Sequence, residues 1–223
     1  MFQKIANLMM VIGLTFCASL KADLQSDLND ASGVFDRFAK KQSNMVPAEV
    51  LKNSKGVAYV KAGKGGILFG VQRGTGFVVT KRGSNWSAPS AFGARSVDFR
   101  VQLGYTCTEY VWVLNSDQAV QAFSSGQTFT FPAQLGYGPG PTMQKDGTLT
   151  KEDKFDVWVY ARQNGFFMPP EMHNLYVVPL PNANKKFYGC NIPVQSLLDG
   201  SVSRPAKAQC FYNALDGYIQ KRS

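Results

Sequence analysis

An alternating run constrains the fold of this chain more than any other feature of the sequence. Apolar side chains occupy every second position from Val97 to Cys107, and the polar residues Asp98, Arg100 and Gln102 fall on the other parity. Successive side chains of a β-strand point to opposite faces, so the run predicts a half-buried strand. It leads into Tyr110–Leu114, which is apolar throughout and indicates a strand buried on both faces.

Helical periodicity is found at both ends of the chain and at one place between them. Apolar residues spaced three or four apart predict helices over residues 23–42, 47–55 and 118–123, and a last helix after Pro205. Short apolar segments between glycines predict further strands at residues 57–60, 67–71, 77–80, 128–131, 155–161 and 175–178. We therefore expect a single α+β domain, with a largely antiparallel sheet and helices at its N- and C-terminal ends.

Residues 1–22 have the pattern of a signal peptide. Lys4 gives a positive start, and the apolar run Leu8–Ala18 is too short to cross a bilayer, which needs roughly 20 apolar residues. We expect cleavage after Ala22 or after Ser19, and a mature domain over residues 23–223 that is exported to the periplasm or secreted. The alternatives are a buried N-terminal helix and, less favoured, a lipid on Cys17. No later segment is long and apolar enough to predict a transmembrane span.

Export would place the remaining cysteines in an oxidising compartment. After removal of Cys17, three remain, which in an oxidising compartment allows one disulfide and one free thiol. Cys190 and Cys210 are the favoured pair and would close a loop of about 20 residues. Because the chain has neither a C-x-x-C motif nor a Cys/His cluster, we expect no zinc site and no cofactor.

The distribution of charge indicates an anionic partner. The net charge is +9, and residues 61–100 carry seven bases against the single acid Asp98. In an exported protein this excess favours phospholipid headgroups or another envelope polyanion over nucleic acid. The alternative is a basic surface that serves only solubility. Candidate lipid-binding residues are Lys61, Lys64, Arg73, Lys81, Arg82 and Trp86.

The basic residues at the turn and Trp86 are interpreted separately. Lys81 and Arg82 adjoin a predicted turn, so both side chains are expected to project into solvent. Trp86 could place an amphipathic ring at a membrane interface. A tryptophan within the core is an equally favoured interpretation.

The sequence gives little support for catalysis. The glycine-rich segment Gly63–Gly76 lacks the order of a phosphate-binding loop, and His173, the single histidine, stands beside two prolines. No G-x-S-x-G motif is present, so a hydrolase is the least favoured function. Glu109 would face the core if the strand continued unbroken, and it would then need a partner for its charge. A bulge at Thr106–Thr108 that returns Glu109 to solvent is the favoured alternative.

Several ordered motifs resemble the SYLF family, a lipid-binding and actin-associated module that is also found in exported bacterial proteins. The most specific is Gly74–Val79, followed by the basic pair Lys81-Arg82 and by Trp86–Ser90. Upstream, Val46–Leu51 and Lys55–Ala58 are similar to family elements, as are Val111–Phe123 and Gly138-Pro139 downstream.

The resemblance implies a curved, mostly antiparallel sheet and a binding role without chemistry. Related members bind phosphoinositide-type lipids, and others bind actin, which makes a protein–protein interaction module the alternative function. Two segments depart from the family pattern. The first helix of lipid-binding members is lysine-rich, whereas residues 23–38 here contain four aspartates and one arginine. Residues 168–174 replace a glycine-rich turn.

Overall fold

The structure is a computed structural model that describes residues 22–39, 46–66, 70–98, 104–131, 133–142, 144, 148–150, 154–165 and 175–222. Residues 1–21 of the expected signal peptide, including Cys17, lie outside the described residues. So do His173 and the segment 168–174.

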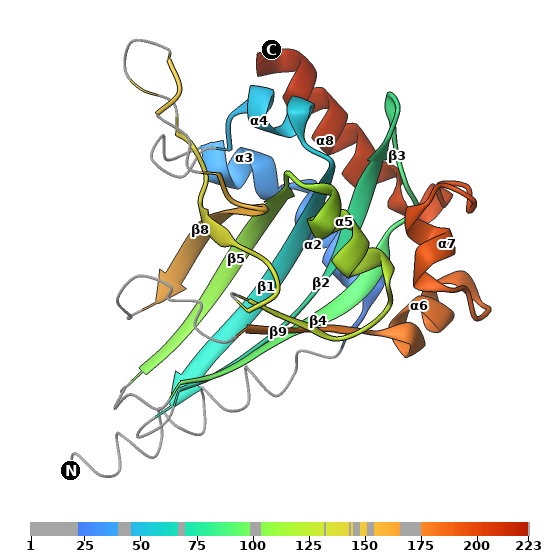
Figure 1. Ribbon diagram of the computed structural model, residues 1–223, viewed down its shortest axis with the longest axis horizontal. Helices are drawn as coiled ribbons and strands as arrows, with labels where there is room; N and C mark the ends of the chain where they lie inside the picture. The colour runs from blue at the N-terminus through green and yellow to red at the C-terminus, as the bar shows by residue number, and fades with distance from the viewer. Residues whose placement is uncertain are drawn as a thin grey trace.

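One curved, mostly antiparallel sheet forms the centre of the domain (Figure 1). Its order is β6-β9-β4-β2-β1-β5-β8-β7, β3 pairs with β2, and the pairing of β7 with β8 is parallel. The strands are β1 (Gly56–Gly66), β2 (Gly70–Arg82), β3 (Asn85–Trp86), β4 (Ser90–Asp98), β5 (Gly104–Leu114), β6 (Phe129–Phe131), β7 (Tyr137–Pro139), β8 (Val157–Gly165) and β9 (Leu175–Pro179). The predicted α+β class, with an antiparallel sheet and helices at both ends of the domain, is confirmed.

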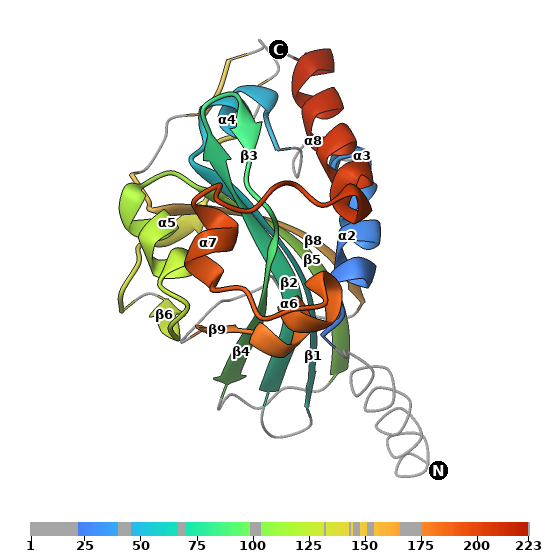
Figure 2. The same ribbon diagram turned by 90° about the vertical axis from the view of Figure 1, so that its right-hand side faces the viewer.

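Helices cover both faces of this sheet (Figure 2). One face carries α2 (Leu24–Ser32), α3 (Val34–Ala39), α4 (Ala48–Asn53) and the C-terminal α8 (Gln209–Arg222). The other carries α5 (Asp117–Ser124) and α7 (Val194–Leu198). The helix α6 (Pro181–Tyr188) follows β9, and the short 3₁₀ helix η2 (Ala206–Ala208) precedes α8. We call the two sides of the sheet the α8 face and the α5 face.

Strand alternation divides the buried side chains into two cores. On the α8 face, Phe77 meets Phe211 of α8 edge to face, with ring centroids 4.8 Å apart. On the α5 face, Trp112 stacks on Phe92 at 5.6 Å. The segment Tyr110–Leu114 supplies both cores in turn, so its predicted burial on two faces is confirmed.

Two predicted elements are divided in the structure. The alternating run Val97–Cys107 is not one strand, because β4 ends at Asp98, β5 begins at Gly104, and β2 and β1 lie between them in the sheet. All strands share the period of two, so alternation cannot mark the boundary between them. The helix expected over residues 23–42 is interrupted at Gly33, which ends α2 before α3 begins. Asp23 caps α2, as its side chain accepts from the amides of Gln25 and Ser26.

The glycine pair of the Gly74–Val79 motif allows β1 and β2 to approach closely. A Cβ on Gly76 would lie 1.9 Å from the carbonyl oxygen of Tyr59, and one on Gly74 would lie 2.8 Å from the Cβ of Ala62. Neither distance is compatible with a larger side chain, so these glycines serve strand packing.

Candidate binding surface

The six predicted lipid-binding residues do not form one patch. Lys61, Arg73, Lys81 and Trp86 belong to the α8 face, whereas Lys64 and Arg82 belong to the α5 face. The division follows from strand geometry, since neighbouring residues such as Lys81 and Arg82 point to opposite sides of a strand. A single membrane-facing patch made of all six is therefore inconsistent with the fold.

Lys61 is engaged by the first helix. Its Nζ lies 2.8 Å from Oδ2 of Asp30 on α2, and this hydrogen bond raises the pKa of the lysine. The ion pair ties α2 to the middle of β1. An anionic ligand would have to displace a carboxylate to reach this side chain.

Glu109 faces the helices and has several partners, so the favoured prediction of a bulge is wrong. β5 pairs with β1 and β8 without interruption, and Glu109 lies opposite Lys61 and Arg162 with only 9% of its surface exposed. Its carboxylate accepts from Nε and Nη2 of Arg37 at 3.0 and 2.5 Å, from the Tyr59 hydroxyl at 3.0 Å and from Arg162 at 3.2 Å. Two guanidinium groups offset the cost of burying this charge.

Trp86 is a core residue, which is the second of the two interpretations given above. The side chain is 4% exposed, and its Nε1 donates to Oδ1 of Asp216 on α8 at 2.9 Å. Lys81 lies over the ring at 5.8 Å from its centroid, and its Nζ donates to the carbonyl of Lys52 at the end of α4. Because the ring is covered, it is not available to enter a membrane interface in this conformation.

Arg82, at the turn between β2 and β3, links this turn to α7. Its Nε and Nη2 donate to the carbonyl of Leu198 at 2.8 and 2.6 Å, and the Thr80 hydroxyl donates to the same oxygen. Leu198 is the last residue of α7, so Arg82 satisfies a carbonyl at the C-terminal end of that helix. The side chain is exposed, as expected, and its guanidinium is also bound to α7.

The turn between β2 and β3 lies at one end of the molecule together with the ends of two helices (Figures 1 and 2). We call Lys52, Lys81, Lys221 and Arg222 the terminal basic surface. Lys52 is in the last turn of α4, and Lys221 and Arg222 form the last turn of α8. Sequence reasoning missed the helical members because they lie outside residues 61–100, the segment to which the excess of bases was assigned. A basic last turn on each helix was the available indication.

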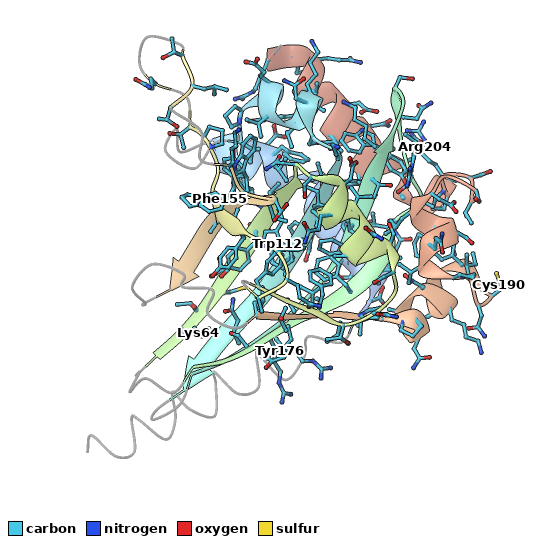
Figure 3. The ribbon with its side chains drawn as sticks, viewed as in Figure 1. Lys64, Trp112, Phe155, Tyr176, Cys190 and Arg204 are labelled. Atoms are coloured by element: carbon cyan, nitrogen blue, oxygen red, sulfur yellow. The ribbon has the colours of Figure 1, made fainter. Side chains whose placement is uncertain are left out.

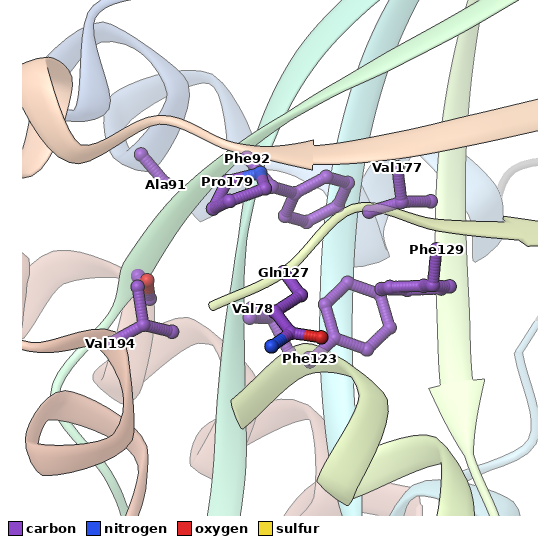
Figure 4. A pocket seen from close by; sticks show the side chains of 10 residues that line it. Val78, Ala91, Phe92, Phe123, Gln127, Phe129, Val177, Pro179 and Val194 are labelled. Atoms are coloured by element: carbon purple, nitrogen blue, oxygen red, sulfur yellow. The ribbon is translucent and has the colours of Figure 1, made fainter. Parts of the chain in front are cut away.

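A groove of about 150 Å³ borders the terminal basic surface. It lies between the first helices and α8, and its lining includes Phe35, Asp36, Gly217, Tyr218 and Lys221. A second cavity, of about 10 Å³, lies beneath α5 among Phe92, Phe123, Phe129 and Val194 (Figure 4). That volume is close to the minimum for one water molecule. Neither offers the enclosed space of a cofactor site.

The described part of the chain holds no set of three His, Cys, Asp or Glu side chains able to bind a metal ion. Its cysteines, Cys107, Cys190 and Cys210, are all free. Cys190 follows the left-handed C-cap Gly189 of α6, and Cys210 lies on the exposed side of α8. The predicted disulfide between Cys190 and Cys210 is therefore not formed in this structure. None of the described helices combines the length and apolarity needed to span a bilayer.

The family model described as Ysc84, Las17-binding protein actin regulator, matches residues 95–218. This chain belongs to the Ysc84 family. The resemblance to SYLF proteins inferred from the motifs is thereby confirmed. The chain is also 28% identical over 209 residues to the SH3 domain-containing YSC84-like protein 1 of Bos taurus and of Homo sapiens, covering 91% of this chain and 61% of those proteins. It is 28% identical over 202 residues to Protein YSC84 of Saccharomyces cerevisiae, covering 86% of this chain and 43% of that protein.

This member of the Ysc84 family thus spans about three fifths of the mammalian relatives and less than half of the yeast one. Its most specific motif serves the fold. The Ser87 hydroxyl accepts from the amide of Thr80 at 3.0 Å, and the Ser90 hydroxyl accepts from Asn184 of α6 at 3.2 Å. With Trp86 bound to α8, the Trp86–Ser90 motif joins β2 and β4 to two helices.

Proposed function

We propose that this Ysc84-family domain is a non-catalytic binding module that associates with anionic lipid surfaces through the terminal basic surface. The observation that carries the proposal is the convergence of bases from α4, the β2–β3 turn and α8 on one end of the molecule. Membership of a family described as an actin regulator supports a binding role rather than catalysis.

The local balance of charge favours attraction to an anionic surface. The terminal basic surface holds four bases, and the acids on the same elements are Glu49 of α4 and Asp216 of α8. Asp36 of α3 lines the bordering groove. Asp216 is already engaged by the Trp86 indole. A base near an anionic membrane contributes about 1 kcal/mol, so four bases supply binding of useful strength at low salt.

Vesicle co-sedimentation tests the proposal. The double substitution Lys52→Glu and Lys221→Glu leaves the Arg82 contact with α7 intact and reverses two exposed charges. We expect it to weaken binding to phosphatidylglycerol vesicles by more than tenfold at low salt, with little binding of either protein to phosphatidylcholine. Raising the salt concentration should likewise weaken the binding of the parent protein to phosphatidylglycerol vesicles.

A matched control reverses the same number of charges elsewhere. Lys185→Glu and Lys207→Glu lie on α6 and η2, away from the terminal basic surface. This control should retain most of the binding. Equal loss in both double variants would indicate attraction to net charge alone and would contradict the assignment of the surface.

A protein partner is the second candidate function. The family description names Las17 binding and actin regulation, and LAS seventeen-binding protein 3 of Saccharomyces cerevisiae is 26% identical to this chain over 202 residues. Co-sedimentation with filamentous actin distinguishes the two functions. Binding to actin that persists at high salt, without binding to vesicles, would favour the protein partner.

We also infer that the domain of residues 23–223 acts after export, as a periplasmic or secreted protein. The support is the charged start and short apolar run within residues 1–22. The mass of the protein recovered from the exported fraction should match a chain that begins at Asp23 or Leu20. An unprocessed chain confined to the cytoplasm would contradict export.

A further inference from the structure

Two arginines lie directly opposite each other at the end of the sheet that is away from the terminal basic surface. Arg73 of β2 and Arg95 of β4 are register partners, and both are exposed on the α8 face. Side chains at such positions have Cβ atoms about 5 Å apart, and like charges placed there destabilise the sheet. The position therefore costs stability unless an anion is bound.

No acid of the first helix relieves this repulsion. Asp23 accepts from Lys186 at 2.6 Å, Asp27 accepts from the Thr75 hydroxyl at 3.3 Å, and Asp30 pairs with Lys61. Burial also raises the pKa of Asp27 to about 7, which reduces its charge near neutral pH. Within the described residues, Arg73 and Arg95 have no ion-pair or hydrogen-bond partner.

The neighbours in the same cross-strand row leave space and add an aromatic group. Tyr176 of β9 lies opposite Arg95 and is 48% exposed, and Gly63 of β1 lies opposite Arg73 and has no side chain. Figure 3 places Tyr176 toward the end of the sheet away from the C-terminal end of α8. Arg82 lies nine residues beyond Arg73 along β2, which corresponds to about 30 Å along a strand.

We propose that Arg73, Arg95 and Tyr176 form a site for the phosphoryl group of a phosphate monoester. Two guanidinium forks match the several oxygens of a phosphate, and a monoester carries close to two negative charges at neutral pH. A carboxylate would balance only one of the two arginines. The Tyr176 hydroxyl supplies a further donor at the edge of the row. This site is separate from the terminal basic surface and does not depend on it.

Calorimetry with phenyl phosphate tests the site in solution, with benzoate as the carboxylate of similar size. We expect phenyl phosphate to bind at least tenfold more tightly than benzoate. The double substitution Arg73→Gln and Arg95→Gln should abolish this binding, and Arg73→Lys with Arg95→Lys should weaken it although the charge is kept. Lys185→Gln with Lys207→Gln is the control with the same change of net charge and should bind like the parent.

Thermal unfolding gives a readout that also reports on folding. Saturating phenyl phosphate should raise the melting temperature of the parent and of the control, but not that of the Arg73→Gln and Arg95→Gln variant. Without ligand, this variant should be at least as stable as the parent because the repulsion is removed. Equal binding by parent and double variant, or no binding of phenyl phosphate by the parent, would overturn the proposal.

Vesicles distinguish a lipid from a soluble source of the phosphoryl group. Phosphatidate presents a monoester, whereas phosphatidylglycerol presents a diester. If the ligand is a lipid headgroup, the parent binds phosphatidate vesicles more tightly than phosphatidylglycerol vesicles, and the arginine double variant binds both with the affinity that the parent shows for phosphatidylglycerol. If phenyl phosphate binds in solution and phosphatidate binding is unchanged by the substitutions, the site takes a soluble phosphate ester.

Discussion

At the scale of single residues, the α8 face buries more charge than the sequence suggested. Asp27 and Glu109 both point from their elements into the space between α2, α3 and the sheet. Glu109 is neutralised by Arg37 and Arg162, and Glu109 in turn raises the pKa of Arg37 through their hydrogen bond. Among the described residues, Asp27 has no base in direct contact, and its side chain accepts from the hydroxyl of Thr75.

Asp27 should make the domain less stable as the pH rises. Its pKa in the folded chain is about 7, chiefly because burial disfavours the charged form, against 3.8 in an unfolded chain. The folded state keeps Asp27 protonated at pH values at which the unfolded chain has already lost this proton. The resulting stabilisation of the folded state is complete below about pH 4 and is lost as the pH rises toward 7. Between pH 5 and pH 8 we expect the free energy of unfolding to fall by about 2 to 3 kcal/mol.

Urea unfolding across that pH range measures the effect. Asp27→Asn keeps an oxygen that can accept from the Thr75 hydroxyl but removes the titration. This variant should show a flatter profile and greater stability than the parent at pH 8. A parent profile that is already flat over this range would contradict the assignment to Asp27.

At the scale of elements, sequence patterns located the strands better than their pairing. The Gly74–Val79 motif was recognised as a family feature, but its role in the approach of β2 to β1 depends on the register Val60 to Gly76. Register is set by contacts between strands, and one sequence does not contain that information. For the same reason the basic residues of 61–100 looked continuous, although alternate residues point to opposite faces.

A pair of glycine substitutions tests this packing. Gly76→Ala should destabilise the domain by about 2 to 3 kcal/mol, because its Cβ would lie 1.9 Å from the carbonyl oxygen of Tyr59. Gly217→Ala, within α8, places its Cβ in open space and should stabilise by about 0.5 to 1 kcal/mol. Chemical denaturation of both variants provides the comparison. Equal effects of the two substitutions would show that helix and strand propensity, rather than close approach, decides the result.

At the scale of the whole molecule, the fold class, the sheet type and the family were all predictable. Alternation, helical spacing and ordered motifs are local properties, and each can be recognised in a single sequence. The proposed binding sites were harder to predict from the sequence. The terminal basic surface joins residues 52, 81 and 221, and the arginine pair joins residues 73 and 95, so both exist only once the chain has folded. Sequence analysis named Arg73 but could not name its neighbour.

The first and last helices of the domain share one core. The Tyr218 hydroxyl of α8 donates to the carbonyl of Val46 just before α4, and α8 packs against α2. A chain emerging from a ribosome or a secretion channel therefore cannot close this core until its final turns have arrived. Until then the apolar side of α2 has no stable cover, and non-local pairing of this kind folds slowly. If the chain is exported as proposed, this delay keeps it unfolded while it passes through the secretion channel.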